Sequence, residues 1–129
     1  MFYGFVYIGA KMKTETIYFP NLDQEITYYI GKNKNENFAV IDMADSEDLW
    51  FHAKEISSCH VVAIIPLNGD YSAKEMMTII KTGAALCKEN TLKLNGFSNV
   101  EILYTKIKNV IKTKVPGYVH TCNTKIVVV

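Results

Sequence analysis

The sequence contains no arginine, and all 14 of its basic residues are lysines. A lysine ammonium meets a phosphate as a compact, hydrated point charge, and it cannot make the planar two-pronged contact of a guanidinium group. We therefore expect any anion-binding surface of this chain to bind loosely, to be sensitive to salt and to read base edges poorly.

Cysteines and long apolar runs are also scarce. The 3 cysteines are an odd number in a chain of 129 residues, which does not suit a disulfide framework and favours a reduced, cytoplasmic protein. The longest apolar run, Val61–Leu67, is far shorter than the ~20 residues that span a bilayer. Residues 1–10 lack the basic leading segment of a secretory signal. We expect no membrane partner.

The residues that are present indicate one domain over residues 1–129, because 49% of them are hydrophobic and a chain of this length buries a single sizeable core. The net charge of +1 hides an asymmetry between the two halves. Residues 1–73 hold 5 lysines against 10 acidic residues, and residues 74–129 hold 9 lysines against 3. Such a split is typical of an interaction surface, although an A/T-rich coding sequence would also enrich lysine.

Hydrophobic periodicity predicts a chain made mostly of strands. The segments Phe2–Ile8 and Thr14–Phe19 are rich in aromatic and β-branched residues and are expected to form a hairpin. Strands are also predicted at residues 24–30, 49–52, 60–65, 100–105, 118–122 and 125–129.

Two helices are predicted beside these strands. Ser72 and Glu75 form a capping box, and an apolar stripe at steps of three or four residues carries a long amphipathic helix over about residues 72–89. A short helix is expected at about residues 37–43, with Asn35 or Asn37 as its N-cap. Most linkers between strands are too short for parallel crossovers, so the predicted fold class is α+β, with a mainly antiparallel sheet of about six to seven strands.

No constellation of residues points to an enzyme or to a cofactor. Cys59–His60 and His120–Cys122 offer four zinc-binding side chains, but adjacent residues of a strand point to opposite faces, so we expect no metal site. No glycine-rich phosphate-binding loop is present. The only cluster of carboxylates, Asp42, Asp45, Glu47 and Asp48, is explained by a solvated turn.

The most basic segment is residues 102–114, which contains no acidic residue. If it is extended, its lysines share one face; if it is a helical turn, they surround a buried apolar stripe. In both cases we expect the lysines to be exposed and unpaired, either as a solvated face or as a patch that contacts phosphates. These are Lys106, Lys108, Lys112 and Lys114.

Trp50 is the only tryptophan of the chain and shares a predicted strand face with His52. An exposed aromatic side chain beside cations stacks unpaired bases in many RNA-binding proteins. The alternative is that Trp50 belongs to the core, because a lone tryptophan in an apolar strand is usually buried.

Three motifs resemble the signature of the NFACT-R domain family. Gly31–Asn37 matches its glycine-basic-asparagine turn, Asp48–His52 its D-[LI]-W-[FL]-H strand, and Ser57–Val62 its small-small-His-Val strand entry. Further matches at residues 103–105, 110–112, 116–117 and 125–127 extend the resemblance over about residues 26–129. Residues 1–25 have no counterpart in these motifs.

The resemblance implies a non-enzymatic, RNA-associated domain of the kind found in ribosome quality-control factors, with tRNA or ribosomal RNA, and with it the ribosome, as partner. DNA remains a possible ligand, because a lysine surface that contacts only the backbone discriminates little between the two nucleic acids. Two alternatives stay open: a protein-interaction module that docks on a ribosomal or nucleic-acid-processing assembly, and an RNA-modifying enzyme or its accessory subunit. The oligomeric state is not predicted.

Residue by residue, the resemblance assigns RNA contacts to the asparagine turn and to the two motif strands. The frequent arginine after the motif glycine is a lysine in this chain, which removes the possibility of a two-pronged contact there. A structural role is the alternative, in which Asp48 accepts backbone N–H bonds and the histidines form hydrogen bonds between strands. The residues assigned in this way are Lys32, Asn33, Lys34, Asn35, Trp50, His52 and His60.

Overall fold

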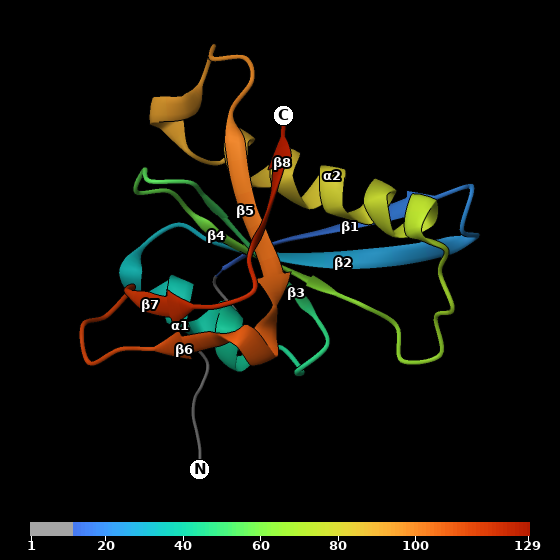
Figure 1. Cartoon of the computed structure of the whole chain (residues 1–129), viewed down its shortest axis with the longest axis horizontal. Helices are drawn as coiled ribbons and strands as arrows, with labels where there is room; N and C mark the ends of the chain where they lie inside the picture. The colour runs from blue at the N-terminus through green and yellow to red at the C-terminus, as the bar shows by residue number, and fades with distance from the viewer. Residues whose placement is uncertain (1–11) are drawn as a thin grey trace.

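The computed structural model describes residues 12–129, which form an α+β fold (Figure 1). The predicted strand Phe2–Ile8 therefore lies outside the described residues. The strands are β1 (Lys13–Phe19), β2 (Gln24–Gly31), β3 (Leu49–Ala53), β4 (His60–Ile64), β5 (Glu101–Lys106), β6 (Val110–Lys112), β7 (Val119–Thr121) and β8 (Lys125–Val128). The helices are α1 (Lys34–Asp42) and α2 (Ala73–Glu89), with short 3-10 turns η2 (Leu92–Leu94) and η3 (Ile107–Asn109).

Six strands form one sheet in the order β1-β2-β4-β3-β5-β8, and β6 and β7 form a second, two-stranded sheet. Every pair is antiparallel, which confirms the predicted fold class. Within the described residues, β1 forms its hairpin with β2, with Phe19 opposite Gln24 at the turn. No described helix is both long and apolar enough to cross a lipid bilayer.

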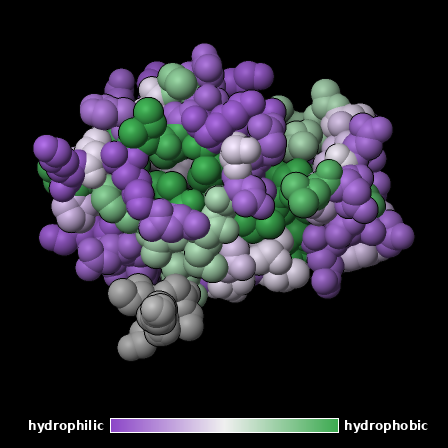
Figure 2. Space-filling model, turned by 90° about the horizontal axis from the view of Figure 1, so that it is seen from below, coloured by the Kyte–Doolittle hydropathy of each residue, from purple (hydrophilic) through white to green (hydrophobic). Residues whose placement is uncertain are grey.

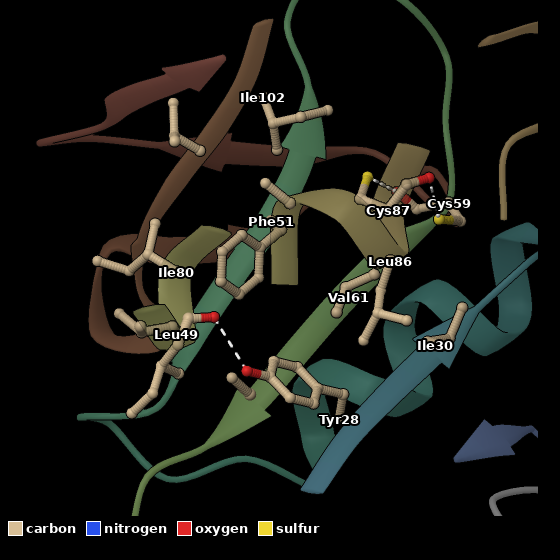
Figure 3. Packing of buried hydrophobic residues seen from close by; sticks show 14 of the residues in the cluster. Tyr28, Ile30, Leu49, Phe51, Cys59, Val61, Ile80, Leu86, Cys87 and Ile102 are labelled. Carbon is tan, nitrogen blue, oxygen red and sulfur yellow. Dashed lines mark hydrogen bonds between the residues drawn. The ribbon is translucent and has the colours of Figure 1, made fainter. Parts of the chain in front are cut away.

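Helix α2 packs on one face of the large sheet, and its local signals are those predicted from the sequence. Ser72 and Glu75 form the capping box, and Asn90 ends the helix. Phe51 of β3 is fully buried beneath α2 (Figure 3). A Cβ atom added at Gly83 of α2 would lie 2.4 Å from the Phe51 ring, so this glycine lets the helix approach the sheet.

The opposite face of the sheet is covered only in part, by α1 and by the β6–β7 hairpin (Figure 1). These elements enclose a second, smaller core that contains Trp50, Val62, Val40 and Val110. The rest of this face, around His52 of β3 and Leu103 of β5, lines the cavity described below.

Helix α1 begins earlier than the sequence predicted, and its N-cap is Asn33 rather than Asn35 or Asn37. The Asn33 side-chain oxygen accepts hydrogen bonds from the backbone N–H groups of Asn35 and Glu36, at 3.1 and 2.9 Å. The prediction was wrong because the first turn of α1 is polar, and the apolar periodicity begins only at Phe38.

The basic segment 102–114 is neither wholly extended nor wholly helical. It consists of β5, the 3-10 turn η3 and β6 in succession. The turn moves the chain from the large sheet to the small one, and buries Ile107 in the second core. This change of direction separates Lys106 from Lys112, so the lysines do not share the single face expected of a strand.

Candidate nucleic-acid interface

A cavity of about 850 Å³ opens on the uncovered half of the sheet. Trp50, His52 and Leu103 of the sheet are among the residues that line it. Its other walls come from four segments, residues 32–37, 55–60, 90–93 and 116–119, which lie toward the left of Figure 1. In Figure 2, which shows the molecule from below, apolar side chains reach the surface in patches framed by hydrophilic ones.

The turn before α1 forms one wall of this cavity and is held by the capping interactions of the helix. Besides the Asn33 cap, the Glu36 carboxylate accepts a hydrogen bond from the backbone N–H of Lys32 at 2.9 Å. Asn37 joins the helix to the sheet, because its side-chain oxygen accepts from the backbone N–H of His60 at 3.2 Å. The backbone that carries the Lys32 and Lys34 side chains is therefore fixed.

Two glycines permit the close packing of this wall. A Cβ atom added at Gly31 would lie 2.8 Å from the backbone nitrogen of Asn37, and one added at Gly117 would lie 2.8 Å from Cβ of Lys34. Gly117 also has a φ of +86°, which a residue with a side chain rarely adopts. The β6–β7 turn consequently rests directly on the first residue of α1.

Tyr118 follows this glycine and is 68% exposed at the wall of the cavity. Its backbone is held by the hairpin, because its carbonyl accepts a hydrogen bond from the Thr113 N–H at 3.0 Å and its N–H donates to the Val115 carbonyl at 3.0 Å. The cavity therefore carries one exposed aromatic ring on a fixed backbone.

The Trp50, His52 and His60 side chains form a packed group on the sheet face of the cavity. The Trp50 indole N–H donates to Nδ1 of His60 at 3.1 Å, which confirms the predicted hydrogen bond between strands for His60. The His52 ring lies parallel to the indole with 5.7 Å between centroids. Trp50 is only 2% exposed and belongs to the second core, which confirms the core alternative for this residue, and His52 rather than a base stacks on the indole.

Both of these histidines are neutral at pH 7. Burial, and to a smaller extent the neighbouring His52, lowers the pKa of His60 to about 3. Burial also lowers the pKa of His52, against an opposing effect of the hydrogen bond that its Nδ1 donates to the Ala53 carbonyl at 2.7 Å. Because the Nδ1 lone pair of His60 is occupied and its pKa is far below 7, His60 is poorly suited to general base catalysis.

The segment after α2 forms the opposite wall and is attached to the start of β4. The backbone N–H of Cys59 donates to the Thr91 hydroxyl at 3.1 Å, and that hydroxyl donates to the Cys87 carbonyl at 2.8 Å. Lys93 lies on this segment, is exposed, and faces the same cavity as Lys32 and Lys34.

The charge of the cavity rim is positive. Three lysines, Lys32, Lys34 and Lys93, line it, and Glu55 is the acidic residue among its lining groups. Among residues 12–129, none of these lysines forms an ion pair. Their charges are therefore available to an anionic ligand.

Three of the four lysines of the basic segment are paired, which corrects the expectation that they are free. Lys106 and Lys108 both bind the Glu47 carboxylate, at 2.7 and 3.1 Å, and this carboxylate has a lowered pKa because it accepts hydrogen bonds from the two ammonium groups. Lys112 pairs with Asp42. Two of the carboxylates interpreted as a solvated turn, Asp42 and Glu47, are thus the partners of these lysines.

The remaining predicted residues lie elsewhere. Lys114 is exposed, forms no ion pair within the described part of the chain, and is outside the cavity lining. Asn35 lies in the exposed first turn of α1 and is also outside the lining. Asp48 has the predicted structural role, because its carboxylate accepts from the backbone N–H groups of Asp45 and Ile65, at 2.7 and 2.8 Å.

The cavity thus brings together six of the residues singled out from the sequence, and two more that were missed. The six are Lys32, Asn33, Lys34, Trp50, His52 and His60. Lys93 and Tyr118 were missed because neither belongs to a local motif with a chemical meaning. A partial signal for Tyr118 was the preceding Pro116-Gly117 turn.

For the residues that the structure describes, no group of three or more His, Cys, Asp or Glu side chains is arranged to hold a metal ion.

Comparison with known proteins identifies a matching protein family and several related proteins. The family model described as the NFACT protein RNA binding domain matches residues 15–122, so the match begins ahead of the motifs and takes in most of β1. A coiled-coil domain-containing protein 25 homolog from Dictyostelium discoideum is 32% identical over 75% of this chain and 47% of its own length. Coiled-coil domain-containing protein 25 from Mus musculus is 33% identical over 67% of this chain and 41% of its own length.

A solved structure has the same fold. It is the C-terminal part of a fibronectin/fibrinogen-binding protein from Streptococcus suis, with a TM-score of 0.66 and 27% sequence identity. The match covers 81% of this chain and 40% of that one. The chain therefore spans less than half the length of the relatives that it matches here.

Proposed function

Because this chain belongs to the NFACT RNA-binding domain family, we propose that it is a non-enzymatic RNA-binding domain that holds tRNA or ribosomal RNA at the cavity beside α1. The observation that supports this site most strongly is the presence of three lysines without ion pairs, Lys32, Lys34 and Lys93, around a cavity lined by the family's motif residues. We place the phosphate contacts at these lysines, because Lys106, Lys108 and Lys112 are already bound to carboxylates.

The proposed binding is mainly electrostatic. Each phosphate that a lysine neutralises on a single strand releases about 0.7 counterions, and this release supplies most of the binding free energy. Lysine ammonium groups give no two-pronged contact with bases. The domain therefore holds the RNA backbone, and sequence preference is expected to be weak.

A cytoplasmic location belongs to the same proposal. Its support is the presence of free thiols at Cys59, Cys87 and Cys122, which are usual where the environment is reducing. The ribosome is the proposed assembly, because it holds both of the proposed RNA ligands. This chain matches less than half the length of the longer relatives. The proposal therefore covers RNA binding by this domain and no activity of the other parts of those proteins.

The experiment that tests the proposal is ultraviolet crosslinking in cells that express the chain, followed by sequencing of the bound nucleic acid. We expect tRNA or ribosomal RNA to be enriched with the wild-type chain and lost when Lys32, Lys34 and Lys93 are changed to Glu. Enrichment of DNA, or of no nucleic acid at all, would overturn the proposal. Tight association with a protein that does not weaken between ~50 and 200 mM salt would instead favour a protein-interaction module, because phosphate-driven complexes lose affinity steeply over this range.

A further inference from the structure

We infer that the cavity takes one unpaired nucleotide of the RNA, with its base stacked on Tyr118 and its phosphates held by the lysines of the rim. This inference rests on the proposed RNA-binding function and adds to it the class of RNA that is bound. Three observations support it: the size of the cavity, the exposed aromatic ring on its wall, and the contrast between its uncharged floor and its positively charged rim.

The size of the cavity suits a single nucleotide. Its volume of about 850 Å³ lies within the range of roughly 300–1,000 Å³ that holds compact organic ligands. A double helix is too wide to enter such a space, so a duplex would touch the rim only through its backbone. A nucleotide that is not paired has its base free to turn into the cavity.

The aromatic ring on the wall is Tyr118 and not Trp50. The Trp50 indole is 2% exposed, whereas Tyr118 is 68% exposed, and His52 already stacks on the indole. The backbone on both sides of Tyr118 is fixed by the hairpin and by the contact of Gly117 with Lys34. Because this backbone is fixed, a base that stacks on the exposed ring has only the tyrosine side chain to order.

The cavity has an uncharged floor and a positively charged rim. This arrangement matches a nucleotide, because its base is uncharged and its phosphate is anionic. The floor is uncharged, because it is built from Trp50, Leu103 and His52, and burial keeps His52 neutral at pH 7. The Nδ1–H of His52 donates to the Ala53 carbonyl, which leaves its Nε2 atom as a hydrogen-bond acceptor. The rim carries the unpaired ammonium groups of Lys32 and Lys34 and, across the cavity, of Lys93.

The test uses Tyr118→Ala and Tyr118→Phe with two synthetic RNAs of equal charge: a blunt two-stranded duplex, and a duplex with a short unpaired overhang that contains 2-aminopurine. Phe97, 62% exposed and outside the cavity lining, provides the matched control variant Phe97→Ala. We expect Tyr118→Ala to weaken binding of the overhang RNA about tenfold or more and to leave the blunt duplex unaffected. Tyr118→Phe and Phe97→Ala should behave as the wild type does.

A second measurement keeps the inference testable if affinities change little. Stacking quenches 2-aminopurine fluorescence, so the overhang should be quenched by the wild-type chain and not by Tyr118→Ala. Equal quenching by both chains, or an equal loss of affinity for both RNAs, would overturn the inference while leaving the proposed function intact. If neither RNA binds the wild-type chain, the proposed function fails, and the inference fails with it.

Discussion

Acidification should destabilise the fold through His60, whose neutral form is required by the core. The pKa of this side chain is about 3 in the folded chain, against an ordinary value of 6.5, because burial and, to a smaller extent, the neighbouring His52 disfavour its charged form. Between these two values the unfolded chain binds a proton that the folded chain does not bind. The contribution of His60 to stability is therefore complete above pH 6.5 and is lost as the pH falls toward 3.

The magnitude follows from the two pKa values. Between pH 7 and pH 5, the unfolded chain gains about 0.7 proton at this position, and integration over this range lowers the free energy of unfolding by about 2 kcal/mol. Burial lowers the pKa of His52 as well, so this second histidine acts in the same direction.

Urea unfolding at pH 7 and pH 5, followed by circular dichroism, measures this effect on the wild type and on His60→Gln. The variant should be less stable at pH 7, because a buried group has been replaced, but its stability should fall by about 2 kcal/mol less on acidification. Comparing the two chains removes the contributions of the carboxylates and of the other histidines. If both chains lose the same stability between the two pH values, the reasoning about His60 is wrong.

Two further predictions concern the elements that position the cavity. Asn33→Ala should lower the free energy of unfolding by about 1 kcal/mol, because two backbone N–H groups at the start of α1 lose their acceptor; Asn35→Ala, which removes no cap, should change it by less than ~0.5 kcal/mol in the same urea titration. Gly83→Ala should destabilise the chain by roughly 1–3 kcal/mol in thermal unfolding, because the added methyl group collides with the Phe51 ring. Unchanged stability of Asn33→Ala or of Gly83→Ala would contradict the packing described for that element.

The parts of the fold that could be predicted from the sequence are those with local signals. Helix α2 has a capping box and a long apolar stripe, and both are properties of neighbouring residues. The strand at β4 could be recognised because both of its faces are buried, which requires a continuous apolar run. The start of α1 has no such apolar signal, so only the side-chain cap at Asn33 defines it.

The candidate site could be predicted only in part, because local sequence patterns do not show which distant residues come together in the fold. His52 and His60 come together because β3 and β4 are neighbouring strands of one hairpin, and the turn at Lys32 adjoins them because Gly31 pairs with His60. The pairing of Lys106 with Glu47 joins residues 59 positions apart, and no local pattern reveals it. The asymmetry of charge between the two halves is thus partly neutralised when the chain folds.

The central claim is that the free lysines of the cavity, and not the paired lysines of the basic segment, hold the RNA phosphates. The direct measurement is the salt dependence of binding to a single-stranded RNA, by fluorescence anisotropy, for Lys32→Ala/Lys34→Ala/Lys93→Ala and Lys106→Ala/Lys108→Ala/Lys112→Ala. Each variant removes three lysines. For the cavity variant, the slope of log affinity against log salt should become shallower by about 2, at ~0.7 for each lost phosphate contact, whereas the second variant should keep nearly the wild-type slope. If the slope changes more in the second variant than in the cavity variant, the account is contradicted.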